Sequence, residues 1–265
     1  LIKNDEPAAR LFTQGMVIKD GAKMSKSKGN VVSPDDMIAR YGADATRMYA
    51  LFAVPPDKDL EWQEDGVAGI SRFLSRVYRL VAKYGAGEVA ARDGAASAVE
   101  QKLLRKLHQT IAKITLDFSG RWHFNTSIAA TMELVNEIVS AEAAIDAGEV
   151  SAAAVNEVLR NLVLLLAPFA PFIAAELWQQ LGGDGVVFRV PWPVADEALL
   201  HEDEIEIPVQ MNGKLVNVVT VPVGSQEGVV KAAALADAKV AARVAGKTVV
   251  KVIVVPGKLV NLVVK

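Results

Sequence analysis

Apolar residues recur at helical spacing through the middle of the chain. The pattern predicts helices over roughly residues 64–83, 98–118, 125–147, 151–166 and 171–181. Asn125 and Ser151 stand where an N-cap would lie in two of these helices. Because the connections between the helices are modest, they predict an α-helical bundle over residues 62–182.

The stretch before the bundle is more varied. Residues 11–18 (LFTQGMVI) are apolar and compatible with a strand, and a polar loop follows them directly. Ser33 and Pro34 are a helix start signal, Gly42 is a stop signal, and a second short helix is expected over 43–53. The apolar side chains of the first stretch have no obvious cover, so we expect disorder or a non-native contact there. These side chains are Leu11, Phe12, Val17 and Ile18.

The pattern changes again after the linker VPWPVADEALL. Residues 205–223 alternate around Asn212-Gly213, which is a hairpin signal, and residues 226–245 read as an Ala-rich helix. Two β-branched runs then flank Pro256-Gly257 within residues 248–264. The order predicts a small ββαββ domain of the α+β class.

Composition supports a globular protein and limits its chemistry. The chain has 265 residues, is 51% hydrophobic and 23% charged, and carries a net charge of −2, so any binding of polyanions must be local. It has no cysteine, and its histidines (His108, His123 and His201) show no metal-ligand spacing. The longest uncharged run, residues 161–175, is shorter than the roughly 20 residues of a membrane span. We therefore expect no membrane segment and no metal site built by this chain.

A local cationic site is present in the polar loop, residues 19–30 (KDGAKMSKSKGN). Its lysines, serines and closing glycine can fold ammonium groups, hydroxyls and backbone amides around phosphate oxygens. If charge builds on a leaving pyrophosphate, such lysines stabilise the transition state more than the ground state. The alternative is an ordinary solvated lysine loop, and the order of a P-loop is missing.

Residues 23–27 of this loop read KMSKS, the signature of class I aminoacyl-tRNA synthetases. Further stretches resemble bacterial leucyl-tRNA synthetases in particular, and the resemblance covers nearly the whole chain. These stretches are TQGMV, KGNVVSPDDMI, YGADATR, DKDLEW, FNTSIAATMELVN, APFAPFIAAELW, PWPVADE, MNGKLV and VPGKLVNLVV. DKDLEW and the last two separate leucyl enzymes from isoleucyl, valyl and methionyl relatives, whose equivalent fragment is an alternative.

The resemblance implies a mainly α fold that ends in an α+β domain. Residues 1–61 would be the remnant of a Rossmann-type catalytic core with the KMSKS loop. Residues 62–195 would be an anticodon-binding-type helical bundle with its linker, and residues 196–265 a C-terminal domain that contacts tRNA. It implies a cytoplasmic leucine–tRNA ligase that forms leucyl-adenylate from leucine and ATP and passes the leucyl group to leucine tRNA.

The resemblance also assigns roles within the loop. Lys26 would contact the ATP phosphates, Lys23 would assist, and Ser25 and Ser27 would shape the loop, with Met24 as a packing anchor. Mg²⁺ is expected to arrive with ATP, although no protein ligand for it is identified in this chain.

The other half of the ATP site, with its HIGH motif, would lie upstream of Leu1 in the same protein. We therefore expect this polypeptide alone not to activate leucine. A different hypothesis is a non-catalytic tRNA-binding subunit that acts in trans with a separate N-terminal half.

Candidate tRNA contacts are basic. Arginines and a lysine recur at intervals of four, three and four in the first long helix, where they would form one cationic stripe or an ordinary solvated face. They are Arg72, Arg76, Arg79 and Lys83. In the last domain Lys214, Lys258 and Lys265 are candidates, whereas Val216 and Asn217 stand where relatives commonly carry a basic residue. The tryptophans are interpreted as packing anchors: Trp62, Trp122, Trp178 and Trp192.

Overall fold

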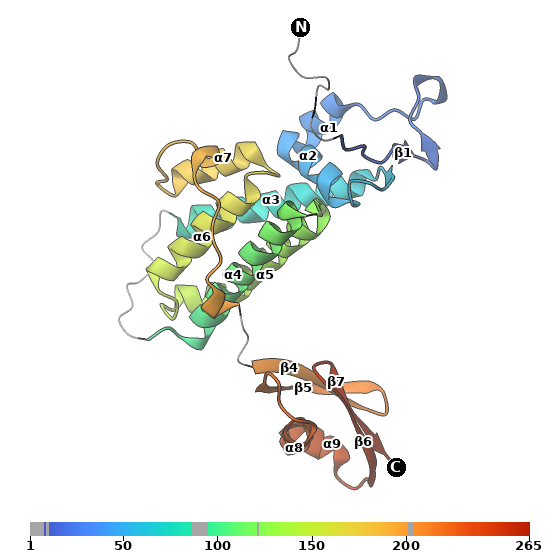
Figure 1. The fold of residues 1–265 in the computed structure, drawn as a ribbon, viewed down its shortest axis with the longest axis vertical. Helices are drawn as coiled ribbons and strands as arrows, with labels where there is room; N and C mark the ends of the chain where they lie inside the picture. Colours follow the sequence, from blue (N-terminus) through green and yellow to red (C-terminus); the bar gives the residue numbers. More distant parts are fainter. Residues whose placement is uncertain (1–7, 9–10, 86–94, 121, 201–203) are drawn as a thin grey trace. The chain divides into compact units, whose positions relative to one another are not determined.

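The computed structural model describes residue 8 and residues 11–85, 95–120, 122–200 and 204–265. The chain divides into two compact units, Leu1–Leu200 and His201–Lys265. Figure 1 follows the elements along the sequence, from blue at the N-terminus to red at the C-terminus. The fold class is the predicted one, because helices dominate the first unit and an α+β unit follows.

The first unit opens with a small three-stranded sheet, in the order β2-β1-β3. β1 forms an antiparallel hairpin with β2 and pairs in parallel with β3. A parallel pair requires a crossover, which here consists of the lysine loop and two short helices. The elements are β1 (Val17–Lys19), β2 (Ala22–Lys23), the 3₁₀ turn η1 (Lys26–Lys28), α1 (Pro34–Tyr41), α2 (Ala43–Phe52) and β3 (Leu60–Glu61).

Longer helices pack beside this sheet as the periodicity predicts. They are α3 (Glu64–Tyr84), α4 (Ala98–Ser119), α5 (Phe124–Asp146), α6 (Ala152–Leu166) and α7 (Pro171–Gln180). Short 3₁₀ turns, η2 (Val187–Arg189) and η3 (Glu197–Leu199), follow them. One apolar core joins Met48 of α2 and Leu60 of β3 to buried residues of all five helices. The sheet that carries the lysine loop is therefore anchored to the bundle.

One predicted cap is confirmed and the other is wrong. The Ser151 hydroxyl accepts the Ala154 N–H at 3.2 Å and caps α6. Asn125 lies inside the first turn of α5, whose N-cap is His123. The hydroxyls of the next two residues, Thr126 and Ser127, donate to the buried Asp117 carboxylate and so tie this first turn to α4.

The predicted lack of cover at the N-terminus is confirmed for Leu11 and wrong for Val17. Leu11 is 90% exposed. Phe12 is 40% exposed, and its ring lies 5.2 Å from that of Trp122. Val17 instead packs against the main core, because the pairing of β1 with β3 places it opposite Leu60, a buried member of that core, and Ile18 is half-buried.

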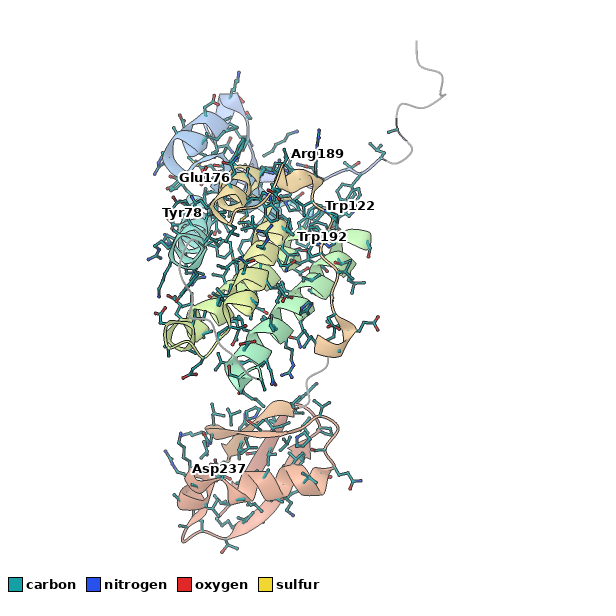
Figure 2. All side chains as sticks on the ribbon, turned by 90° about the vertical axis from the view of Figure 1, so that its left-hand side faces the viewer. Tyr78, Trp122, Glu176, Arg189, Trp192 and Asp237 are labelled. Carbon is teal, nitrogen blue, oxygen red and sulfur yellow. The ribbon has the colours of Figure 1, made fainter. Side chains whose placement is uncertain are left out.

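The tryptophans pack as predicted. Trp178 is buried in the core. Trp192, labelled in Figure 2, stacks on Phe118 at 5.5 Å and donates its indole N–H to Thr115 at 2.8 Å. Trp62 meets Tyr49 edge-on at 5.0 Å.

The second unit is a four-stranded sheet in the order β5-β4-β7-β6, with β4 and β7 parallel in the centre. Both predicted hairpins are confirmed. The single predicted helix is wrong, because Asp237, labelled in Figure 2, interrupts it. Its carboxylate caps a second helix by accepting the N–H groups of Lys239 and Val240. The elements are β4 (Glu204–Met211), β5 (Lys214–Pro222), α8 (Glu227–Ala236), α9 (Ala238–Val244), β6 (Val249–Val255) and β7 (Leu259–Val264).

Candidate functional site

The lysine loop presents its charges outward. Asp20 and Gly21 form the tight turn between β1 and β2, both at positive φ. Lys23, Lys26 and Lys28 are exposed, and the last two lie in η1, which buries no side chain. The ammonium groups therefore stand free of apolar packing, on a short piece of fixed backbone.

Hydrogen bonds within the loop fix that backbone. The hydroxyls of Ser25 and Ser27 lie 2.6 Å apart, as expected of serines that shape the loop. The Lys28 N–H donates to Ser25 O at 3.1 Å, and Gly29, at φ 66°, donates to Lys26 O at 3.2 Å. Met24 is half-buried, which is compatible with a packing role.

Sequence reasoning missed Asn30, whose side chain closes the loop. It is 9% exposed, and its amide oxygen accepts the Ser25 N–H at 2.9 Å. Its NH₂ group donates to Lys19 O at 3.1 Å and lies 3.4 Å from the carbonyl oxygens of Ala22 and Lys23. The signal was a single asparagine after the glycine, which any turn would also accept.

The donor set of the loop suits an anion. The ammonium groups and hydroxyls of residues 23–28 offer hydrogen bonds to phosphate oxygens, and the one carboxylate of the loop is that of Asp20 in the β1–β2 turn. Within the described residues, no group of three or more histidines and carboxylates is placed to hold a metal ion. The cationic groups of the loop therefore suit phosphate oxygens.

The histidines have structural positions. His108 is buried, and its Nδ1 accepts the Asp196 N–H at 3.0 Å, while Nε2 lies 3.2 Å from the Glu157 carboxylate. It thereby joins α4 and α6 to the segment after the bundle. His123 precedes α5, and His201 lies outside the described residues.

A second cationic feature lies on α3. Arg72, Arg76 and Arg79 line one hollow of about 540 Å³, with Met132 of α5 on its wall. Gly66 and Gly69 also line this hollow, and the missing side chain of Gly66 leaves room for the Tyr49 ring, which a Cβ there would meet at 2.3 Å. We call the three arginines the arginine face. The Nε of Arg76 is buried without a hydrogen-bond partner in the part of the chain that the structure describes.

Lys83, the fourth residue of the predicted stripe, differs from the arginines. Its ammonium group contacts Asp146 at 2.8 Å and Glu142 at 3.2 Å, both on α5. The hydrogen bond to Asp146 raises the pKa of Lys83 above its usual value and lowers the pKa of Asp146. The structure thus neutralises Lys83 locally and separates it from the arginine face.

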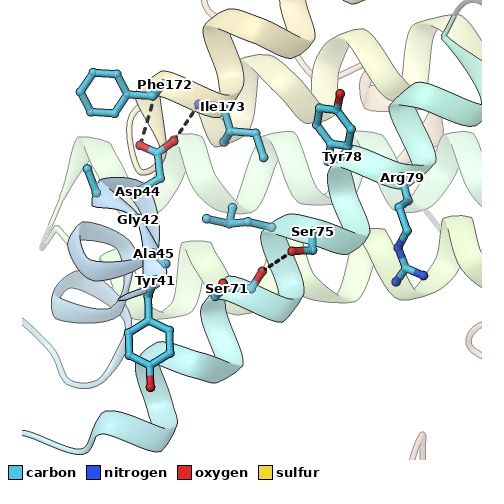
Figure 3. Close-up of a pocket in the computed structure, with 12 residues that line it drawn as sticks. Tyr41, Gly42, Asp44, Ala45, Ser71, Ser75, Tyr78, Arg79, Phe172 and Ile173 are labelled. Atoms are coloured by element: carbon cyan, nitrogen blue, oxygen red, sulfur yellow. Dashed lines mark hydrogen bonds between the residues drawn. The ribbon is translucent and has the colours of Figure 1, made fainter. Parts of the chain in front are cut away.

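Arg79 also borders a larger hollow of about 790 Å³ between α2, α3 and α7 (Figure 3). Tyr78 and Phe172 lie on its rim, 43% and 69% exposed. Asp44 of α2 accepts the N–H groups of Phe172 and Ile173, at 3.3 and 2.7 Å, and so fixes the start of α7. The two hollows flank α3, and Arg79 lies between them.

The candidate lysines of the second unit do not lie together. Lys214 follows the β4–β5 turn, whereas Lys258 lies in the β6–β7 turn, and the strand register places these turns at opposite ends of the sheet. Lys265 pairs by backbone with Thr248 at the Lys214 end. Asn217 donates to Asp237 at 2.9 Å, so it ties β5 to the break between α8 and α9.

Two known protein families match the sequence of the chain. Residues 1–63 match the class I tRNA synthetases for I, L, M and V, and residues 100–231 match the anticodon-binding domain of tRNA ligase. Leucine–tRNA ligase of Solibacter usitatus is 49% identical over 265 residues, and that of Thioalkalivibrio sulfidiphilus is 50% identical over 267. The chain belongs to the leucine–tRNA ligase family. It corresponds to the C-terminal portion of these ligases. The two matches cover the whole of this chain but only 32% of the length of each relative.

A solved structure agrees with this assignment to the leucine–tRNA ligases. It is the crystal structure of a LeuRS of Agrobacterium radiobacter in a ternary complex with tRNA and LeuAMS. The TM-score is 0.69 at 34% sequence identity, and the match covers 99% of this chain and 34% of that one.

No helix among the described residues is long and apolar enough to cross a membrane.

Proposed function

We propose that the chain supplies the ATP-phosphate loop and the tRNA-binding surfaces of a leucine–tRNA ligase. In this assignment residues 1–61 complete a catalytic core, residues 62–195 form the helical tRNA-binding domain, and residues 196–265 form a further tRNA-contacting domain. The intact protein would join leucine and ATP to leucyl-adenylate and pyrophosphate in the cytoplasm. It would then transfer the leucyl group to the terminal adenosine of leucine tRNA.

The observation that carries the proposal is the lysine loop, which carries KMSKS and holds its lysines exposed on hydrogen-bonded backbone. Lys26 and Lys23 stabilise the charge that develops on the leaving pyrophosphate, and Ser25 and Ser27 hold the turn between them. Because flexible lysines act as point charges, they can follow the phosphates as the bond to the leaving group lengthens.

On the tRNA side, the arginine face is the best supported contact. Three guanidinium groups around one hollow, with no acidic residue among its lining residues, suit a phosphate of an RNA backbone. Lys214 and Lys258 belong to the proposal as separate contacts. Their positions at opposite ends of the sheet fit two points along a nucleic acid rather than one site.

Exchange of pyrophosphate with ATP tests the catalytic part of the proposal. In the ligase that contains this chain, Lys26→Ala should slow leucine-dependent exchange by about 10²- to 10³-fold. Lys28→Ala is the matched control, since Lys28 is exposed in the same turn but lies outside the pentapeptide, and should change the rate less than about tenfold. Equal rates for wild type and Lys26→Ala would refute the proposed function.

A further inference from the structure

We infer that Asn30 is the positioning residue of the lysine loop. Its side chain sets where the ammonium groups of Lys23 and Lys26 stand, and it contacts no substrate itself. This inference rests on the proposed function and adds a residue outside the KMSKS pentapeptide to it.

The burial contrast is the first support. Asn30 is buried, although Lys23 and Lys26, which flank its partner Ser25, are exposed. The turn η1 buries no side chain of its own. The turn η1 therefore has no apolar anchor of its own, and the neighbouring Met24 is only half-buried. Backbone order in such a segment must come from hydrogen bonds that offset its conformational entropy.

The bonds of Asn30 reach both sides of the loop. The NH₂ group donates to the carbonyl of Lys19 in β1 and lies near those of Ala22 and Lys23 in β2. The amide oxygen accepts the N–H of Ser25, the middle residue of the pentapeptide. One side chain thus ties the turn with the lysines to a strand that is itself paired with β3.

Amide chemistry explains why asparagine is needed. An amide offers donors and an acceptor on one short side chain. Aspartate has nearly the same shape and could still accept from Ser25, but it would lose the donors and place a negative charge against carbonyl oxygens. Asn30→Asp should therefore release the loop as Asn30→Ala does, which separates hydrogen bonding from packing.

Trypsin digestion of this chain tests the contact itself. Mass spectrometry would follow initial cleavage after Lys23, Lys26 and Lys28 in wild type, Asn30→Asp and Asn30→Ala. We expect both variants to be cut roughly tenfold faster at these bonds, with an unchanged Tm, because only the loop opens. Asn161→Ala is the matched control, since its amide makes a surface hydrogen bond to Glu157 O within α6. Cleavage of both Asn30 variants at the wild-type rate would overturn the inference.

Kinetics of the ligase test the positioning role. A misplaced catalytic group lowers kcat, whereas loss of simple binding raises KM. We expect Asn30→Asp to lower kcat of ATP–pyrophosphate exchange by about 10- to 100-fold, with KM for ATP within roughly threefold of wild type. A rise in KM at constant kcat would overturn the positioning role. If Lys26→Ala slows exchange and Asn30→Asp does not, this inference fails alone; if Lys26→Ala has no effect, the proposed function fails whatever Asn30 does.

Discussion

The lysine loop and the arginine face are both cationic, but they are held in opposite ways. The loop lysines stand on backbone fixed by serine hydroxyls and one buried amide. The arginines project from a helix whose other side is buried in the core through Val67, Ile70 and Val77. Flexible lysine side chains can follow a leaving group that moves during reaction, whereas planar guanidinium groups grouped on a helix suit a partner that must only be held.

The two sites should therefore be sensitive to different substitutions. Removal of a single hydrogen-bonding group can release the loop while the unit stays folded. The arginine face should lose its binding to tRNA either when the core beneath it is destabilised or when one of its guanidinium groups is removed. Stability measurements and binding measurements therefore separate the two sites.

The largest effect is expected from the core under the arginine face. Ile70 is 1% exposed, so Ile70→Ala should lower the free energy of unfolding by about 2–5 kcal/mol through reduced burial and a cavity. Urea unfolding measures this decrease. Ile38→Ala is the control, because Ile38 is 44% exposed on α1 and should shift the midpoint little. A decrease below about 1 kcal/mol for Ile70→Ala would show that the face does not depend on this core.

The helices under the arginine face were predictable and the closure of the loop was not. Helical periodicity needs only an apolar residue every three or four positions, and α3, α4 and α6 follow it closely. The contacts of Asn30 and Asp117 depend on which side chain reaches a carbonyl or hydroxyl after folding, and local sequence carries no such signal.

The same limit applies to individual charges and to helix interruptions. Sequence spacing grouped Lys83 with the arginines, but it could not show that carboxylates of α5 lie beside it. The break between α8 and α9 at Asp237 could not be predicted, because the surrounding residues are rich in alanine and have high helix propensity. Capping by aspartate and the bond from Asn217 decide it.

A smaller effect is expected at Asp117, which fixes the start of α5, the helix that supplies Met132 to the hollow. Burial alone would raise the pKa of this carboxyl, but hydrogen bonds from Lys113, Thr126 and Ser127 outweigh it and lower the pKa. The folded pKa is thus below the unfolded value of 3.8, so the contribution to stability is complete above that value and disappears as the pH falls through the folded pKa.

Asp117→Asn should therefore lower the free energy of unfolding by about 1–3 kcal/mol at neutral pH. The gap between wild type and variant should narrow as the pH drops below about 4. Urea midpoints across pH test both statements. Asp35→Asn, on an exposed helix start, should show no such gap. A gap that stays constant into acid would mean that the Asp117 charge is not what holds α5.

The smallest effect separates the arginine face from Lys83. Removing one cation that binds a phosphate should flatten the plot of log K against log salt by about 0.9. Arg76→Gln should therefore weaken binding of leucine tRNA and reduce the salt slope by about that amount. Lys83→Gln removes the same formal charge from the same helix, but its ammonium group already contacts Asp146 and Glu142, so binding and slope should stay near wild type. Equal slopes for the two variants would mean that all four cations of α3 contribute alike to tRNA binding. The hollow around the arginines and the ion pairs of Lys83 would then make no difference to binding.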